Sequence, residues 1–487
     1  MYQAALDRKV APWVVNRTAT AVIGMAALGA LTLAVASRQA FPVVAPLVAI
    51  VLLAAGVVVH LYYSDGQLPV FDLGALTILI TAAYSAIPLL GFWLAGLRWT
   101  ELSYLPLYVL NPGPAEVGGF AWRHVLYLYS FTAAYLCFRG RVAIAAGPTR
   151  ELRPSAIAAM AILGAGLLGY FKLLDVMFGV SYDPSYSDLV AVSGSADALP
   201  HVVRQLSHNL FAILFLLKLA ALVWLMSRWR DRRWRGVLFL WLVVDGLLTV
   251  TKMGGRTWYV MLLLATALLY HRLVRPLSVI RAVILVVALL GGVLLYGFAR
   301  DLGGGLNTVA QSDVSPWATM NEFQALYGMA YDLHARQLAG TLGPIPWQIY
   351  AHDIVMLIPS QILPFAKADP CVGYVQVDGM GLGCVLGVIA NAVIGLDWVE
   401  LLLRGLGLGM LFAAIHRWYA RRQDGYWATM FYLCLCLWCY YTYRGSTLYF
   451  GYYILYRFIP LLVAVRLVQI VLRNLPRGAV VPRADRG

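Results

Sequence analysis

Four cationic side chains stand at the ends of long hydrophobic stretches, apart from the clusters that hold most of the chain's arginines: Lys252, Arg256, Arg300 and Arg444. An arginine guanidinium can donate two parallel hydrogen bonds to one phosphate, and a lysine ammonium adds a compact positive charge. The glycines of KMGGRTW (252–258) let the backbone turn tightly and approach a ligand closely. These residue types favour an anionic ligand such as a lipid-linked diphosphate; contact with lipid head groups alone is the other interpretation.

The composition is that of an integral membrane protein. Of the 487 residues, 61% are hydrophobic and only 12% are charged, whereas soluble domains carry about 25% charged residues. A net charge of +14 would suggest a nucleic-acid partner in a soluble protein. In a membrane protein the excess of arginine and lysine in cytoplasmic connections explains it. We therefore expect no nucleic-acid partner.

The apolar stretches predict about twelve transmembrane helices, because each is near the ~20 residues that a bilayer core requires. The predicted spans are 19–36, 41–63, 70–97, 121–138, 155–177, 209–227, 236–252, 257–273, 282–299, 397–416, 426–443 and 447–465.

Basic residues in the connections predict the orientation of these spans. Clusters precede span one, follow spans four, six, eight and ten, and fill the tail after span twelve: Arg8 to Arg17, Arg139 to Arg153, 228–235, Arg272 to Arg281, Arg417 to Arg422, and Arg466 to Arg486. Twelve crossings with both termini cytoplasmic place all six clusters on the same side. The four cations of the first paragraph then lie on the periplasmic side.

The predicted organisation is uneven. Residues 1–299 hold nine spans, 300–396 form a large periplasmic loop, 397–466 hold three spans, and 467–487 form a basic cytoplasmic tail. A loop of that length is usually functional or carries structure of its own. Within it, the apolar pieces 351–365 and 384–395 are too short to span comfortably. We expect short re-entrant or surface-lying helices there, with a hairpin of true spans, giving fourteen, as the alternative.

Cysteines occur in two settings. Cys371 and Cys384 lie in the predicted periplasmic loop, where a disulfide and two separate thiols are both compatible with the spacing. Cys434, Cys436 and Cys439 lie within a predicted span at a spacing unsuited to metal binding, so we expect buried packing residues.

Charged residues inside predicted spans should be paired. Lys218 lies ten residues before Arg228, and Asp245 lies ten residues after Arg235. At 1.5 Å per residue both should sit about 15 Å from the inner boundary, so we expect an ion pair between them. Glu400 and Arg404 are four positions apart and should pair on one helix face.

Further polar candidates lie in the predicted periplasmic loop. Glu322 in MNEFQALYG and His334 in YDLHARQ could each accept a proton or orient a hydroxyl. Arg336 and Lys367 add positive charge on the same predicted face. On this face the sequence has no Asp-x-Asp pair and no His/Cys ligand spacing, so we expect no metal and no cofactor.

Several segments resemble the Wzy-type oligosaccharide repeat-unit polymerases, which build O-antigen and exopolysaccharide. They are GGRTWYVMLLLATALLY on a span hairpin, the NEF of the large loop, IPSQILPF, and GLGCVLGVIANAVIGLDW before the next span. The likeness covers about 240–420 together with the span count. This chain has Asp397 where a phenylalanine–glycine pair is expected in that pattern.

The resemblance implies an all-α polytopic protein of GT-C-like polymerase or ligase architecture in the bacterial inner membrane, with its active site facing the periplasm. The implied reaction transfers a glycan from undecaprenyl diphosphate to a hydroxyl of another lipid-linked repeat unit, with a chain-length regulator and a flippase as further candidate partners. Arg256 would assist catalysis together with Glu322 or His334. The diphosphate would be bound by Lys252, Arg256, Arg300, Arg336 and Arg444.

Three alternatives remain open from the sequence, one of which is a non-catalytic assembly subunit of a polysaccharide export complex. An O-antigen ligase or another glycosyltransferase using polyprenyl phosphosugars would share the architecture. A lipid-linked oligosaccharide flippase or another transporter would share the span count, although the large, asymmetrically placed exterior loop and the lack of an internal repeat disfavour it.

Overall fold

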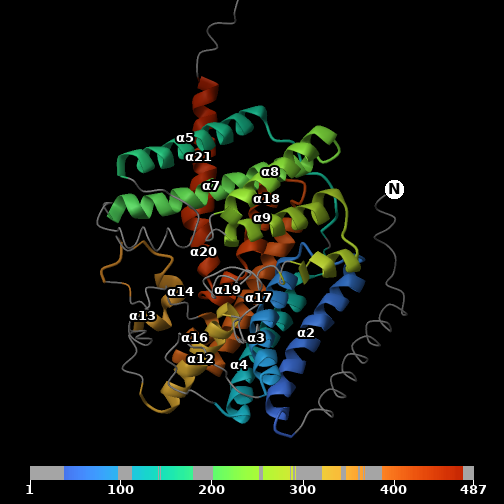
Figure 1. The fold of residues 1–487 in the computed structure, drawn as a ribbon, viewed down its shortest axis with the longest axis vertical. Helices are drawn as coiled ribbons and strands as arrows, with labels where there is room; N and C mark the ends of the chain where they lie inside the picture. The colour runs from blue at the N-terminus through green and yellow to red at the C-terminus, as the bar shows by residue number, and fades with distance from the viewer. Residues whose placement is uncertain are drawn as a thin grey trace, which may run out of the picture. The chain divides into compact units, whose positions relative to one another are not determined.

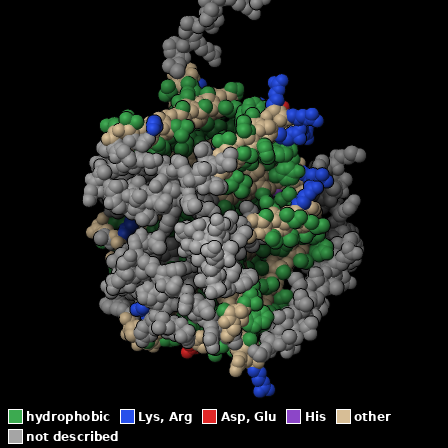
Figure 2. Space-filling view, viewed as in Figure 1, with side chains coloured by type: hydrophobic (Ala, Val, Ile, Leu, Met, Phe, Trp, Pro, Cys, Tyr) green, Lys and Arg blue, Asp and Glu red, His purple; other side chains and the backbone are tan. Residues whose placement is uncertain are grey.

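The structure is a computed structural model, and it describes residues 38–96, 112–140, 142, 144–178, 201–251, 256–285, 287, 288, 291, 321–341, 347–359, 362–365, 367 and 387–474. All regular structure within these residues is helical. Six of the described helical stretches are long and apolar enough to cross a membrane: Phe41–Asp65, Leu73–Leu94, Pro154–Leu174, Asn209–Ser227, Trp398–Ala420 and Tyr449–Asn474. They coincide with six of the twelve predicted spans, and hydrophobic side chains cover much of the described surface in Figure 2.

The chain divides into two compact units. The first contains residues 1–148 and 264–450, and the second contains 149–263 and 451–487. Helices of the first unit, with one π-helical segment, are α2 (Phe41–Asp65), α3 (Leu73–Leu94), α4 (Pro114–Arg139), η3 (Tyr270–Val274), α12 (Asn321–Leu338), α13 (Trp347–Tyr350), α14 (His352–Val355), α16 (Gly387–Ile394), α17 (Trp398–Ala420), α18 (Tyr426–Trp438) and α19 (Tyr441–Arg444).

The second unit contains α5 (Pro154–Phe178), α7 (His201–Ser227), α8 (Arg232–Thr251), η4 (Ile454–Phe458) and α21 (Ile459–Asn474). The boundary between the units falls within α9 (Arg256–Leu269) and within α20 (Tyr449–Tyr453). In this unit the predicted pair forms, with Lys218 Nζ 2.5 Å from Asp245 Oδ1. The prediction from equal membrane depth is therefore confirmed.

The centre of the first unit is the contact of α17 with α4, beside which α2 and α3 pack (Figure 1). Gly405 and Gly409 make the close approach possible. An added Cβ would lie 2.8 Å from the Tyr127 carbonyl oxygen at Gly405 and 2.4 Å from the Phe131 carbonyl oxygen at Gly409. Small residues four apart let two membrane helices bring their backbones together. This spacing fixes which face of α17 meets α4.

The two short loop pieces differ from each other. Within 351–365 the described residues contain one short helix, the four-residue α14, which ends before Pro359. The second piece is the eight-residue α16, and every one of its residues is buried. This burial excludes a surface-lying helix there, and neither helix approaches the length that a span requires. Fourteen spans gain no support from the described residues.

The three cysteines of α18 and its C-cap are buried and unbridged, as predicted: Cys434, Cys436 and Cys439. Cys371 and Cys384 lie outside the described residues.

Candidate functional site

A layer of aromatic and imidazole rings lies between α4 and α12, in the half of the first unit where α4 and α17 begin. The ring of Phe120 stacks on His334 with centroids 5.5 Å apart, and His124 meets the edge of the same ring at 5.5 Å. Tyr327 stacks on His124 at 4.7 Å, and its hydroxyl donates to the Val117 carbonyl at 3.1 Å. Tyr327 and His334, seven residues apart on α12, therefore face α4 in one stripe.

A charged pair borders this layer. Arg123 donates from Nε and Nη2 to the two carboxylate oxygens of Asp397 at 2.7 and 2.6 Å. The Arg123 guanidinium also lies 4.7 Å from the ring centroid of Trp398, and its side chain is largely buried. Asp397 has φ +47° and ψ −115°, a backbone conformation that favours glycine. Its strain is retained at a position where the side chain holds a buried arginine.

Among the predicted site residues, His334 is the one whose protonation state the structure indicates most directly. Burial, and then the nearby positive charge of Arg123, lower the pKa of His334 from 6.5 to about 4, while Asp397 acts in the opposite direction. Among the residues that the structure describes, its Nδ1 is buried without a hydrogen-bond partner. The imidazole is therefore neutral at physiological pH and has a nitrogen with no hydrogen bond from the described residues.

A second charged cluster lies on α17, about two turns after Asp397. Glu400 Oε1 accepts from Arg404 Nε at 2.7 Å, so the predicted pair is confirmed. Arg404 Nη1 donates to Asp353 of α14 and, at 2.6 Å, to Thr447 Oγ1. We call these four residues the Arg404 cluster. It joins three chain segments at one guanidinium.

The turn that follows α19 carries further contacts to the same cluster. The Leu448 amide donates to Asp353 Oδ1 at 3.2 Å, and Ser446 Oγ lies 3.1 Å from Met356 Sδ. Lys367 Nζ donates to the Met356 carbonyl at 3.2 Å. Arg444, the last residue of α19, comes two positions before Ser446. Lys367 thus contacts Met356, which meets this turn through Ser446, and Arg444 directly precedes the turn in the chain.

The first two turns of α17 relate these features to each other. Asp397 and Arg404 are seven residues apart on one helix, which corresponds to about 10 Å along its axis. At one end lie Arg123 and the neutral His334, and at the other lies the Arg404 cluster. The neutral imidazole of His334 and the Arg404 cluster therefore lie within the span of one extended polar ligand.

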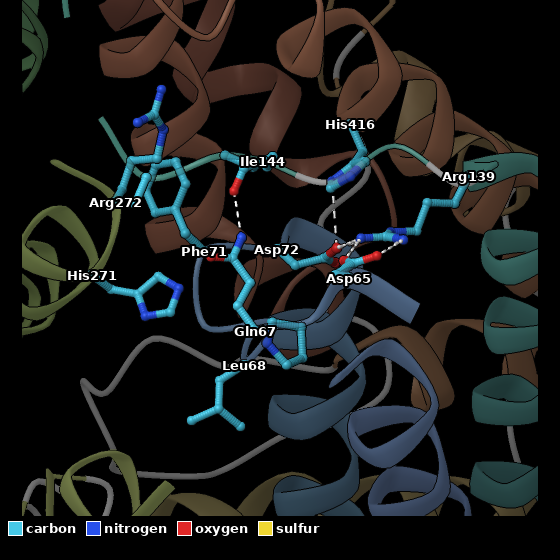
Figure 3. A pocket seen from close by; sticks show the side chains of 12 residues that line it. Asp65, Gln67, Leu68, Phe71, Asp72, Arg139, Ile144, His271, Arg272 and His416 are labelled. Carbon is cyan, nitrogen blue, oxygen red and sulfur yellow. Dashed lines mark hydrogen bonds and ion pairs between the residues drawn. The ribbon is translucent and has the colours of Figure 1, made fainter. Parts of the chain in front are cut away.

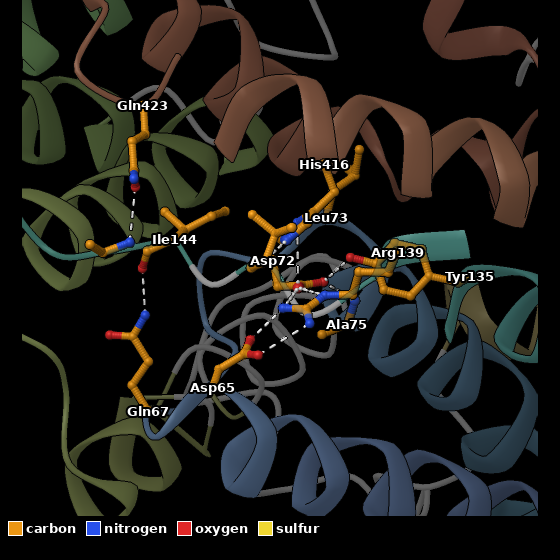
Figure 4. A network of polar contacts seen from close by, with 12 residues as sticks. Asp65, Gln67, Asp72, Leu73, Ala75, Tyr135, Arg139, Ile144, His416 and Gln423 are labelled. Carbon is orange, nitrogen blue, oxygen red and sulfur yellow. Dashed lines mark hydrogen bonds and ion pairs between the residues drawn. The ribbon is translucent and has the colours of Figure 1, made fainter. Parts of the chain in front are cut away.

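The other end of the first unit has a small pocket, shown in Figure 3. Its polar wall is formed by Asp65, Asp72 and Arg139, which we call the clamp. Asp65 ends α2, Asp72 precedes α3, and Arg139 ends α4. Arg139 donates from Nε to Asp72 at 3.0 Å and from both terminal nitrogens to Asp65. Figure 4 shows the clamp with Tyr135, whose hydroxyl donates to Asp72 at 2.6 Å.

His416 of α17 completes this wall. Its Nδ1 lies 2.8 Å from the Tyr432 hydroxyl and its Nε2 lies 3.0 Å from the Val142 carbonyl. Arg272 of η3 donates to the carbonyls of Gly147 and Gln423 at 2.7 and 2.6 Å. These contacts join connections that follow four different predicted spans, and all of them belong to the side predicted to be cytoplasmic.

The two ends of the first unit differ in how completely their buried polar groups are hydrogen-bonded. In the clamp, each carboxylate and the guanidinium make the contacts listed above, as expected of groups that stabilise the fold. In the half that contains α12 and α16, four buried polar atoms lack a partner among the described residues: His124 Nε2, Tyr127 Oη, His334 Nδ1 and Asn391 Oδ1. Unsatisfied buried polar atoms are costly and indicate a bound ligand or water. We therefore take this half as the candidate functional site.

The predicted site residues are only partly brought together. His334, Arg444 and Lys367 lie in the first unit, as described above. Arg336 also lies there, and its Nε donates to Asp332 at 2.7 Å. Lys252 and Arg300 lie outside the described residues, and the same holds for the side chains of Arg256, the first residue of α9, and Glu322, the second residue of α12.

Sequence reasoning did not select Arg123, Asp353 or Asp397 as site residues. One signal was present for Arg123, because an arginine inside a predicted span requires a partner. Nothing in the spacing indicated that the partner would be Asp397 or that Asp353 would reach Arg404.

No known protein family, curated protein or solved structure matches this chain.

Proposed function

We propose that this chain is a membrane glycosyltransferase that polymerises undecaprenyl-diphosphate-linked oligosaccharide repeat units on the periplasmic side of the bacterial inner membrane. One observation carries the proposal. The neutral imidazole of His334 lies beside Arg123 and Asp397 at the start of α17, and the Arg404 cluster with its neighbouring cations lies about two turns further along the same helix. The resemblance to Wzy-type polymerases gives the substrate class.

The reaction needs an activated hydroxyl and a stabilised leaving group. The acceptor hydroxyl oxygen forms a bond to the anomeric carbon of the donor, and the bond from that carbon to the diphosphate oxygen breaks, with the electron pair leaving on the diphosphate. The hydroxyl proton goes to Nδ1 of His334, which is neutral and has no protein partner among the described residues. Arg123 disfavours a positive charge on this ring, and Asp397 accommodates the charge that forms.

Positive charge placed where the diphosphate develops negative charge lowers the barrier, by about 3–4 kcal/mol for one well-oriented donor. Arg444 and Lys367 are the described cations we assign to this role, and Arg256, Lys252, Arg300 and Arg336 remain part of the proposal. Diphosphate is a good leaving group, so no acid is needed to protonate it.

The proposal is tested with the purified full-length protein in detergent and lipid-linked repeat units as substrate. Products longer than one unit, separated by gel electrophoresis, support it. His334→Gln should lower elongation by about 100-fold, the usual contribution of one proton acceptor. His60→Gln is the matched control, because His60 is an exposed imidazole at the end of α2. Wild-type protein that leaves the substrate unchanged, or normal elongation by His334→Gln, would contradict the proposal.

The cations are tested in the same assay. Arg444→Ala and Arg256→Ala should abolish elongation at normal protein level, and lysine at either position should restore it only partly because the two-pronged contact is lost. Arg417→Ala is the control, since Arg417 is an exposed arginine at the other end of α17.

A further inference from the structure

The two edges of the Arg404 guanidinium are hydrogen-bonded to different parts of the chain. Glu400, from the same helix, holds Nε and Nη2, with distances of 2.7 and 2.6 Å to its Oε1. Nη1 is held by Asp353 and by Thr447. The second edge thus depends on a carboxylate that comes from a different segment, the four-residue α14.

A carboxylate on an arginine occupies the place that a phosphate oxygen would take, because both offer paired acceptors to the same planar donors. Asp353 accepts a hydrogen bond from Leu448 in the turn that follows Arg444, a residue predicted to bind an anionic ligand, and Lys367 adds a further positive charge at Met356. Arg404 itself is largely buried, with 10% of its side chain exposed. An anion that reached Nη1 would therefore meet a largely desolvated donor, where hydrogen bonds to charge are strong.

We propose that Arg404 is a binding residue for the diphosphate of the polyprenyl substrate, and that Asp353 is an internal substitute for that diphosphate which the substrate displaces. This inference rests on the proposed function for its substrate class. On binding, the diphosphate takes Nη1 of Arg404, Glu400 stays on the other edge, and α14 moves away from α17. The short exterior helix thereby covers the cations when no substrate is present.

Binding of farnesyl diphosphate to the full-length protein in detergent, measured by isothermal titration calorimetry, tests the assignment. Asp353→Asn keeps the size of the side chain and removes the competing charge, so affinity should rise about tenfold, the value of one charge-assisted hydrogen bond. Arg404→Lys should lower affinity by about tenfold, because the planar donor is lost while the charge remains. Asp231→Asn, an exposed change with the same effect on net charge, should leave affinity unchanged.

Hydrogen–deuterium exchange measures the movement directly. Farnesyl diphosphate should speed amide exchange in 347–359 of the wild-type protein, and Asp353→Asn should show the faster exchange without ligand. Farnesol, which lacks the diphosphate, should have no effect. If Asp353 only stabilises the fold, Asp353→Asn will bind farnesyl diphosphate with equal or lower affinity, and that result overturns the proposal.

Failure of the proposed function gives a different pattern. In one outcome, the wild-type protein does not elongate lipid-linked units while Asp353→Asn binds farnesyl diphosphate more tightly than the wild type does. In that case the diphosphate site stands and only the polymerase assignment is lost. If the wild-type protein elongates the units but Asp353→Asn binds farnesyl diphosphate with unchanged affinity, the polymerase assignment stands. The proposed displacement of Asp353 is then overturned.

Discussion

Arg123 and Asp397 are 274 positions apart in the chain, yet their side chains form a two-pronged ion pair with donor–acceptor distances of 2.7 and 2.6 Å. The pair joins the beginning of α4 to the residue that precedes α17. It lies beside His334, whose pKa responds to both partners. The contact therefore contributes to the packing of the first unit and to the charge of the candidate site.

Removing only one partner of this pair should be more harmful than removing both. Asp397→Gly leaves a largely buried guanidinium without its carboxylate, and we expect a loss of about 3 kcal/mol in the free energy of unfolding. Arg123→Met together with Asp397→Gly should recover part of that loss. The measurement is unfolding by sodium dodecyl sulfate in detergent micelles.

Asp397→Ala supplies the matched control for backbone strain. Because φ is +47° at this position, alanine should be less stable than glycine by about 1 kcal/mol. Equal stability of the two variants would show that the left-handed backbone at this position is not strained.

Elongation should depend on pH through His334. With a pKa of about 4 in the folded protein, the imidazole stays in its proton-accepting form over the whole neutral range. Activity should therefore be nearly constant from pH 8 to about 5.5 and fall as the pH approaches 4. Rates measured across this range check the prediction, and a midpoint near 6.5 would contradict it.

The same histidine should make stability depend on pH. Its pKa is lower in the folded state than the ordinary value of 6.5, so between about 6.5 and 4 the unfolded chain binds a proton that the folded chain does not. Stability should fall as the pH is lowered through this window. The melting temperature of His334→Gln should fall less than that of the wild type.

The clamp of Asp65, Asp72 and Arg139 should be structural. Arg139→Met leaves two buried carboxylates without their cation and should cost about 3–5 kcal/mol, measured by the same unfolding assay. The triple variant with Asp65→Asn and Asp72→Asn should be more stable than Arg139→Met alone. Arg417→Met, a change at an exposed arginine, is the control, and an equal effect there would remove the special role of the clamp.

The Lys218–Asp245 pair gives a second test of charge pairing. With Nζ and Oδ1 2.5 Å apart, Asp245→Ala should impair folding more than the double change with Lys218→Ala, because only the single variant leaves a membrane-embedded ammonium without its carboxylate. Protein yield and melting temperature in detergent are the measurements. Equal impairment in both variants would mean that the pair contributes no net coupling.

Relations along one helix, and between neighbouring helices at equal depth, were predictable from the sequence. Glu400 and Arg404 pair because residues four apart share a helix face, and Lys218 meets Asp245 because both count ten residues from the same basic connection. Six predicted spans correspond to long apolar helices for the same reason, since length and hydropathy are local properties.

The residues of the candidate site were harder to predict from the sequence. His334, Lys367 and Arg444 were selected by residue type and predicted membrane side, which spacing can supply. That Arg336 is held by Asp332 was also readable from the four-residue spacing, although this pairing was not predicted. The neutral state of His334 was not readable, because it depends on burial against Phe120 and on the approach of Arg123.

By itself, the sequence determined which segments are apolar helices, which ends carry positive charge, and which charges on one helix or at one depth must pair. Tertiary structure decided that Asp397 meets Arg123 and that Asp353 meets Arg404. The physical reason is that hydropathy and helical rise act over a few residues. Contacts across hundreds of positions depend instead on the rotation and close approach of packed helices, as where Gly405 and Gly409 of α17 meet α4.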